Sequence, residues 1–341
     1  MLKQLLLGCA LSIPLMQKAL ACAFHGYTPK PTLIDKVFAS EQVVLARIDP
    51  ADPARFEPVE ALAGSLEYVE IPARPDAQTR SQLQAVPGGA VLFARDGAYG
   101  PWVALAVVDP GYRTVVETAL TRQDRWQGQI APDRFRFFAG LLSSANPELR
   151  RLALLELDRA DYAQLRKLRL KGSGALAQGI ESGDANLRPI RILLAGLSRD
   201  RSLAPVLEQG LAEGAERNLR YLGAYATALV ELQGASAVEM LLTRYVARAD
   251  LREETREKVI EALAIQGAFG TGATRRAVRR GLPGVLAAHP ELAGAVARQF
   301  GRHGNWDMGE AVAEVKRDHP KVSLRDSFAI NQYIAFAREG G

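Results

Sequence analysis

The chain has 341 residues, of which 48% are apolar and 24% are charged, and its formal net charge is +5. This composition predicts an ordinary globular protein, long enough for two compact domains, and it argues against large-scale disorder. Residues 1–21 contain Lys3, Lys18 and no acidic residue, so the net charge without them is +3. So small an excess of positive charge excludes a general nucleic-acid-binding protein.

The first 21 residues have the three regions of a secretory signal peptide. Lys3 provides the positive start, LLLGCALSIPLM forms an apolar core over residues 5–16, and Ala19, Leu20 and Ala21 form a small-residue ending. No later stretch has about eighteen uninterrupted apolar residues, so no membrane span is predicted. The sequence therefore predicts a periplasmic or secreted protein.

Two cleavage positions fit this ending, and they differ in what they do to Cys22. Cleavage after Ala23 removes the cysteine, whereas cleavage after Ala21 makes it the first residue. The second product resembles bacterial lipoproteins, although Ala19 stands where those proteins usually have a larger aliphatic residue. In that product the terminal amine, the Cys22 thiolate and the His25 imidazole could bind copper or zinc. The third interpretation is a plain linker behind the signal peptide.

Residues 22–125 are predicted to form a small β-rich domain. TLIDKVFAS predicts a short helix with Thr32 as its N-cap and Asp35 in its first turn. Short apolar runs bounded by turn residues then predict five strands: VVLARI (43–48), FEPVEAL (56–62), LEYVEIP (66–72), AVLFARD (90–96) and WVALAVVD (102–109). One helix followed by five short strands predicts a small β-barrel or sandwich.

The order of this helix, VVLARI, FEPVEAL with Gly64, and LEYVEIP resembles the exported, netrin-like variants of the OB barrel. That resemblance implies an oligonucleotide or sugar ligand. Such ligands need aromatic stacking platforms interleaved with basic residues, and this segment does not show them. We therefore predict no nucleic-acid partner.

Residues 130–320 predict a series of helices, and five segments look like variants of one another. Their starts lie some 32 to 40 residues apart. A helix pair that recurs at this period is typical of a stacked helical solenoid. The segments are NPELRRLALLELD from Asn146, NLRPIRILLAGLSRD from Asn186, NLRYLGAYATALVELQG from Asn218, REETREKVIEALAIQG from Arg252 and PELAGAVARQFGRHG from Pro290.

NPELRRLAL at residues 146–154, with proline opening a helix and apolar residues every three or four, resembles HEAT repeats. This resemblance implies a curved scaffold whose concave face binds proteins or peptides, and it implies no chemistry. The glycine-rich stretch at 267–272 interrupts the pattern. Residues 321–341 carry too many large apolar groups for a free tail and are expected to pack back on the body. The predicted fold class is α+β, mostly α.

Two surface features are candidate binding sites. Arg275, Arg276, Arg279 and Arg280 fall on one helical face, which could bind phosphate groups or an acidic peptide, or could simply be a solvated face. The stretch FARDGAYGPW at 93–102 predicts a hairpin loop. Its Tyr99 and Trp102 are either anchors for a partner or rings folded over their own domain.

The sequence lacks signals for catalysis. It contains no G-x-S-x-G or H-E-x-x-H motif, and His289, His303 and His319 lack metal-ligand spacing. Our leading hypothesis is an exported, non-enzymatic scaffold that holds a protein or peptide of the cell envelope. The alternative is a periplasmic metal- or thiol-linked factor that acts through Cys22 and His25. Contact with a membrane is expected only if Cys22 is lipidated.

Overall fold

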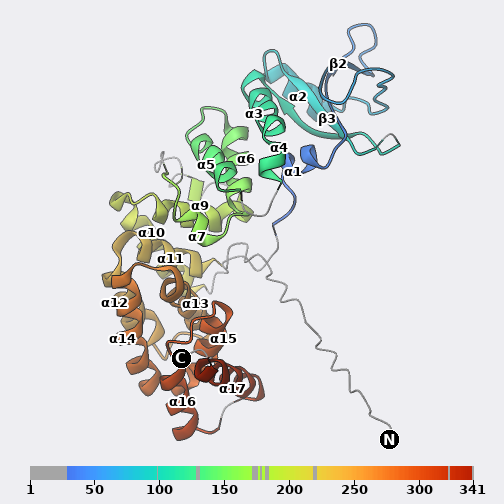
Figure 1. Ribbon diagram of the computed structural model, residues 1–341. Coiled ribbons are helices and arrows are strands. Elements are labelled where there is room, and N and C mark those ends of the chain that lie inside the picture. Colours follow the sequence, from blue (N-terminus) through green and yellow to red (C-terminus); the bar gives the residue numbers. More distant parts are fainter. Residues whose placement is uncertain are drawn as a thin grey trace, which may run out of the picture.

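The computed structural model describes residues 29–97, 99–127, 131–170, 176, 179–180, 184–217, 221–321 and 323–339. In these residues the protein is mostly helical, with one small antiparallel sheet near the beginning of the described chain. The molecule is elongated, with the sheet at one end and helices α16 (Gly309–Asp318) and α17 (Leu324–Glu339) at the other (Figure 1). The predicted class, α+β and mostly α, is confirmed.

The sheet has the strand order β2-β1-β3-β4. Its strands are β1 (Gln42–Ile48), β2 (Phe56–Ala63), β3 (Ala90–Arg95) and β4 (Val103–Val108). In the register of the two central strands, Leu45 lies opposite Leu92 and Val44 lies opposite Phe93. Leu45 and Leu92 belong to the main core that continues into the helices, whereas Phe93 belongs to a second, smaller core on the other face. The centre of the sheet is therefore buried on both faces.

The predicted strand at residues 66–72 is wrong. This segment forms a turn and irregular backbone that crosses the second face of the sheet, where Ile71 is buried against Phe93. Tyr68 has a φ of 57°, which breaks an extended run, and Pro72 has no N–H to donate to a neighbouring strand. The pairings of the described strands close no barrel, so the finer prediction of a barrel or sandwich is not confirmed.

Four short helices accompany the sheet: α1 (Leu33–Phe38), α2 (Ala77–Ala85), α3 (Pro110–Thr121) and α4 (Gln123–Trp126). The predicted cap of α1 is confirmed, because Thr32 and Asp35 form a capping box. Asp109 caps α3 through its side chain, which accepts from the Tyr112 amide at 2.6 Å. Helices α1 and α3 pack against each other and, with β4, begin the main core.

The rest of the chain forms two layers of helices. In the first layer each helix packs on the next, in the order α6 (Pro147–Leu157), α9 (Arg188–Leu197), α11 (Leu222–Gln233), α13 (Glu253–Phe269), α15 (Ala293–Arg302) and α17. The second layer contains α10 (Ala204–Glu216), α12 (Ala235–Leu241), α14 (Gly272–Ala288) and α16. Shorter elements complete this region: α5 (Pro132–Leu141), α7 (Tyr162–Leu165), η1 (Ala185–Leu187), η2 (Arg201–Leu203), η3 (Leu242–Val246) and η4 (Pro290–Leu292).

The five similar segments of the sequence supply five consecutive helices of the first layer, α6, α9, α11, α13 and α15. The packing is close enough for backbones to meet. A Cβ atom added to Gly196 of α9 would lie 2.4 Å from the Cα of Ala228 on α11. Only glycine permits this approach. The similar segments of the sequence therefore form successive helices that pack on one another.

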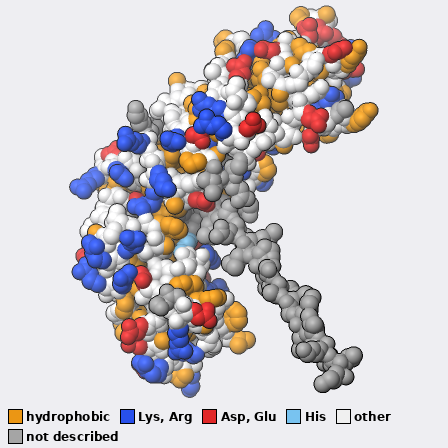
Figure 2. Space-filling view, in the orientation of Figure 1, with side chains coloured by type: hydrophobic (Ala, Val, Ile, Leu, Met, Phe, Trp, Pro, Cys, Tyr) orange, Lys and Arg blue, Asp and Glu red, His pale blue; other side chains and the backbone are white. Residues whose placement is uncertain are grey.

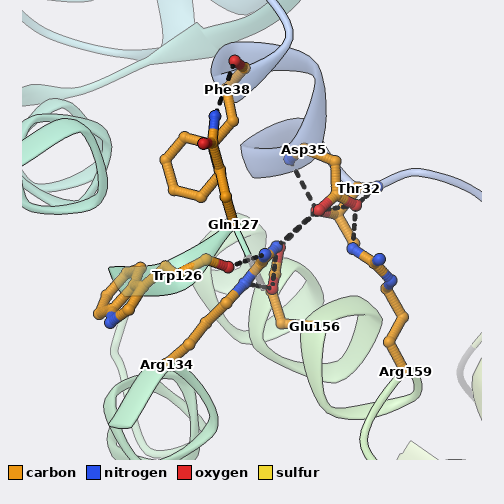
Figure 3. A network of polar contacts seen from close by, with 8 residues as sticks. All are labelled: Thr32, Asp35, Phe38, Trp126, Gln127, Arg134, Glu156 and Arg159. Atoms are coloured by element: carbon orange, nitrogen blue, oxygen red, sulfur yellow. Dashed lines mark hydrogen bonds and ion pairs between the residues drawn. The ribbon is translucent and has the colours of Figure 1, made fainter. Parts of the chain in front are cut away.

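A buried polar network joins α1 to the first helices of this array (Figure 3). Arg134 of α5 donates to Glu156 of α6 at 2.7 Å and to Asp35 of α1 at 2.9 Å. The Thr32 hydroxyl donates to Glu156, and Arg159 donates to Asp35. Arg134 is 5% exposed and Glu156 is fully buried. Two guanidinium groups therefore balance two carboxylates between the sheet end and the helical end.

The surroundings of the two carboxylates shift their pKa values in opposite directions. Burial raises the pKa of Glu156, and this effect outweighs the charge of Arg134 and the hydrogen bond from Thr32. Burial also opposes ionisation of Asp35. Its hydrogen bonds from Arg159 and the Thr32 amide, with the charge of Arg134, nevertheless hold its pKa below the ordinary value. Arg134 is therefore shared by both carboxylates, and Asp35 is held in addition by Arg159 and the Thr32 amide.

Replacement of Arg134 by methionine should destabilise the protein strongly, because it leaves two carboxylates at a buried joint without their shared partner. We expect the free energy of unfolding in urea at pH 7 to fall by about 3 kcal/mol. Arg136→Met is the matched control, since Arg136 lies on the same helix and is exposed; it should change stability by less than about 0.5 kcal/mol. Equal losses in the two variants would contradict the role given to the joint.

Candidate functional site

An open hollow of about 650 Å³ lies where α13, α14 and the segment after α15 meet. We call it the arginine hollow. Three of the four arginines singled out in the sequence border it, whereas Arg280 does not. Its lining residues are Gly267, Ala268, Phe269, Gly272, Arg275, Arg276, Arg279, His303, Gly304, Asn305, Trp306, Asp307 and Ala337. The hollow therefore combines positive charge with aromatic walls.

A tight corner between two helices places these arginines. Helix α13 ends at Phe269 and α14 begins at Gly272, and a Cβ on Gly270 would lie 2.3 Å from the Gln266 carbonyl oxygen. The Thr271 hydroxyl caps α14 by accepting from the Thr274 amide at 3.2 Å. The glycine-rich stretch is thus an interhelical corner. The arginines follow it within the first turns of α14 and share one face.

The arginines of the hollow differ in their partners. Arg279 donates to the Asp307 carboxylate at 3.0 Å. Within the described part of the chain, no hydrogen bond or ion pair engages the guanidinium groups of Arg275 and Arg276, and both side chains are exposed. Two sets of planar donors are therefore free to bind a carboxylate or a phosphate in bidentate fashion.

His303 contributes a neutral polar group to the wall of the hollow. Both of its ring nitrogens are buried, and neither has a hydrogen-bond partner among the described residues. Burial, aided by the charge of Arg302, lowers the pKa of His303 to about 4. The imidazole is therefore uncharged at neutral pH, and it contributes to the wall through its ring, which packs on Phe269.

Contacts within the first layer hold the aromatic wall in place. The ring of Phe269 packs edge-on against Tyr162 on one side and His303 on the other, with centroids 6.0 Å apart in each case. Tyr162 donates to Glu231 and accepts from Gln266 at 2.7 Å. These contacts link α7, α11 and α13, so the wall is set by the packing of three helices.

The other predicted site residues do not gather at this hollow. Tyr99 is fully exposed at the tip of the β3–β4 hairpin. The ring of Trp102 packs on the second core of the sheet, and the Arg95 guanidinium lies 4.7 Å from its centroid. The two aromatic residues thus take opposite roles. Cys22 and His25 lie outside the described residues.

No sequence pattern marked His303 and Trp306 as members of the site. His303 is the C-cap of α15. Its ring contact with Phe269, and its place in the same hollow as the arginines, arise because α15 packs on α13. The spacing of the similar segments was a usable signal. In a stacked array it places the end of the segment from Pro290 beside the end of the segment from Arg252.

Positive charge is not confined to the hollow. Figure 2 shows Lys and Arg side chains along the side of the helical region formed by α10, α12 and α14. Among the described residues, no group of three or more His, Cys, Asp or Glu side chains is arranged to hold a metal ion. None of the helices in the described ranges combines the length and hydrophobicity of a membrane span.

Comparison with known proteins finds no family model, no curated protein and no solved structure that matches this chain.

One acidic residue of α13, Glu261, should contribute to the pH dependence of stability. Burial raises the pKa of Glu261 to about 7, although Arg302 pairs with it at 3.2 Å. Because the folded state holds this proton more tightly than the unfolded state, stability should fall as the pH rises from about 4.5 through about 7. Glu261→Gln should remove that fall and raise the free energy of unfolding at pH 8.5 by about 1–2 kcal/mol, with little change at pH 4.5.

Urea denaturation of both proteins at the two pH values measures this effect. Glu254→Gln is the control, because Glu254 lies on the same helix and is exposed. A variant at Glu261 that is as pH-dependent as the wild type would show that another group is responsible.

Proposed function

We propose that the protein is an exported, non-enzymatic binding protein that holds an acidic segment of a partner protein in the arginine hollow. The observation that carries this proposal is that three arginines border one hollow and two of them have no partner among the described residues. Carboxylate side chains of a bound segment would accept charge-assisted hydrogen bonds from the guanidinium groups of these two arginines.

The state of His303 supports binding over catalysis. A general base works when its ring nitrogens lie within hydrogen-bond reach of a nucleophile and of an orienting group. In the described residues neither nitrogen of His303 has such a partner, and its low pKa keeps the ring neutral. The ring of His303 instead packs on Phe269 and forms part of the wall of the hollow.

The two layers of helices support the finer interpretation of a HEAT-like solenoid, because alternate helices stack on their neighbours at the spacing of the sequence repeats. Export is proposed from residues 1–21. The metal- or thiol-linked alternative depends on Cys22 and His25, and no observation on the described residues favours it.

Arg276 and Arg280 offer a matched test. Both are exposed, both lack a partner among the described residues, and they lie one turn apart on α14, but only Arg276 borders the hollow. The affinity for fluorescein-labelled octaglutamate is measured by fluorescence anisotropy at 0.15 M salt, where screening acts over about 8 Å.

Arg276→Glu should weaken binding at least about tenfold, which corresponds to about 1.4 kcal/mol, whereas Arg280→Glu should weaken it less than about threefold. Equal losses would mean that the peptide responds to overall charge, and absence of binding by the wild type would refute the proposed site.

A further inference from the structure

A second hollow, of about 430 Å³, lies between α15 and α17. We call it the aromatic groove. Four aromatic side chains border it together with three arginines: Trp306, Phe328, Tyr333, Phe336, Arg298, Arg302 and Arg325. Nothing in the sequence patterns had marked this groove as a site.

The rings of the groove are held in position before any ligand binds. Trp306 stacks on Phe336, with centroids 5.3 Å apart, and lies 5.2 Å from Tyr333. The Tyr333 hydroxyl donates to the Asn305 carbonyl at 2.7 Å. A large side chain that enters the groove would therefore meet a preformed aromatic surface, at little cost in ordering.

Helix α17 leaves large apolar groups in water at the end of the array. Phe328 is 70% exposed, Phe336 is 44% exposed, and both border the groove. In stacked helical arrays the terminal unit ordinarily presents a polar face to solvent. Exposed aromatic side chains beside a hollow are typical of the anchor points of protein interfaces.

The charge around the groove favours an acidic occupant. Arg325 is exposed and has no hydrogen-bond or ion-pair partner in the described ranges, and Arg302 is half exposed in its pair with Glu261. A second copy that met this face by two-fold symmetry would bring the same arginines against one another. A segment with carboxylate side chains would instead complement them.

The groove and the arginine hollow are neighbours. Trp306 borders both, while Phe336 and Ala337, consecutive on α17, border the groove and the hollow respectively. An extended peptide advances about 3.3 Å per residue. A short segment can therefore place carboxylates in the hollow and an adjacent side chain in the groove.

We infer that the aromatic groove binds an aromatic side chain of the same acidic segment, so that the partner is recognised by acidic residues next to a phenylalanine, tyrosine or tryptophan. This inference rests on the proposed function of the arginine hollow. It adds a second subsite that selects among acidic segments.

The test uses two labelled glutamate-rich peptides that differ only in carrying a pair of phenylalanines or a pair of alanines. Phe328→Ala is the test variant, and Leu324→Ala is its control because Leu324 lies one turn earlier on α17, is 90% exposed and does not border the groove. Arg276→Glu reports on the arginine hollow. Affinities are measured with the full mature protein.

The phenylalanine peptide should bind the wild type about tenfold more tightly than the alanine peptide, and Phe328→Ala should abolish this difference. Leu324→Ala should leave it unchanged, and Arg276→Glu should weaken both peptides alike. Equal affinities of the wild type for the two peptides would overturn the groove inference while leaving the hollow intact. Failure of both peptides to bind would overturn the proposed function itself.

Two further results would assign the groove to another occupant. A concentration-dependent dimer of the wild type that Phe328→Ala makes monomeric would show that a second copy fills the groove. Binding to vesicles of phosphatidylglycerol that depends on Phe328 would show that it meets a lipid surface. Either result overturns the inference of a peptide subsite.

Discussion

The arrangement of the sheet end relative to the helical end depends on the ion pairs of the Arg134 guanidinium group with Glu156 and Asp35. This group satisfies a fully buried carboxylate on α6 and a capping carboxylate on α1, so the sheet end and the helical end meet in one geometry. Buried ion pairs contribute little net stability, because desolvation offsets their attraction. Their effect here is on specificity. Any other arrangement of the sheet end relative to the helical end would leave a buried charge without its partner and would therefore be higher in free energy. The main core continues across the same joint.

Beyond this joint, successive helices of the first layer pack on one another from α6 to α17. The second layer packs against them through α10 on α11, α12 on α11, α14 on α13 and α16 on α15 and α17. The arrangement places hollows where separate helices meet. The arginine hollow takes its cations from the start of α14 and its aromatic walls from the end of α13 and the segment after α15. No single unit contains the site.

Local patterns in the sequence predicted the local features well. Thr32 and Asp35 were recognisable as a helix start, the arginines of α14 as one helical face, and the repeated segments as equivalent helices. Each of these features depends on residues within one or two helical turns. The strand expected at 66–72 failed because a short apolar run also suits a segment lying across a sheet, and Pro72 removes a donor that a strand needs.

Features that depend on packing between distant segments could not be predicted. Arg134 and Arg136 stand two residues apart in one helix, and the sequence does not show which of them is buried against Glu156. The sequence left the same two roles open for Tyr99 and Trp102, yet Tyr99 is exposed and the ring of Trp102 packs on the domain's own core. His303 joins the arginines only through the stacking of α15 on α13. These outcomes are set by which faces the helices bury.

Hydrogen–deuterium exchange with octaglutamate tests whether the arginine hollow is where this protein binds a partner. Binding there should slow amide exchange on peptide addition in residues 269–280 and 302–309, with no change in residues 42–63 of the sheet. Unchanged exchange around the hollow at saturating peptide, or protection confined to the sheet, would contradict it.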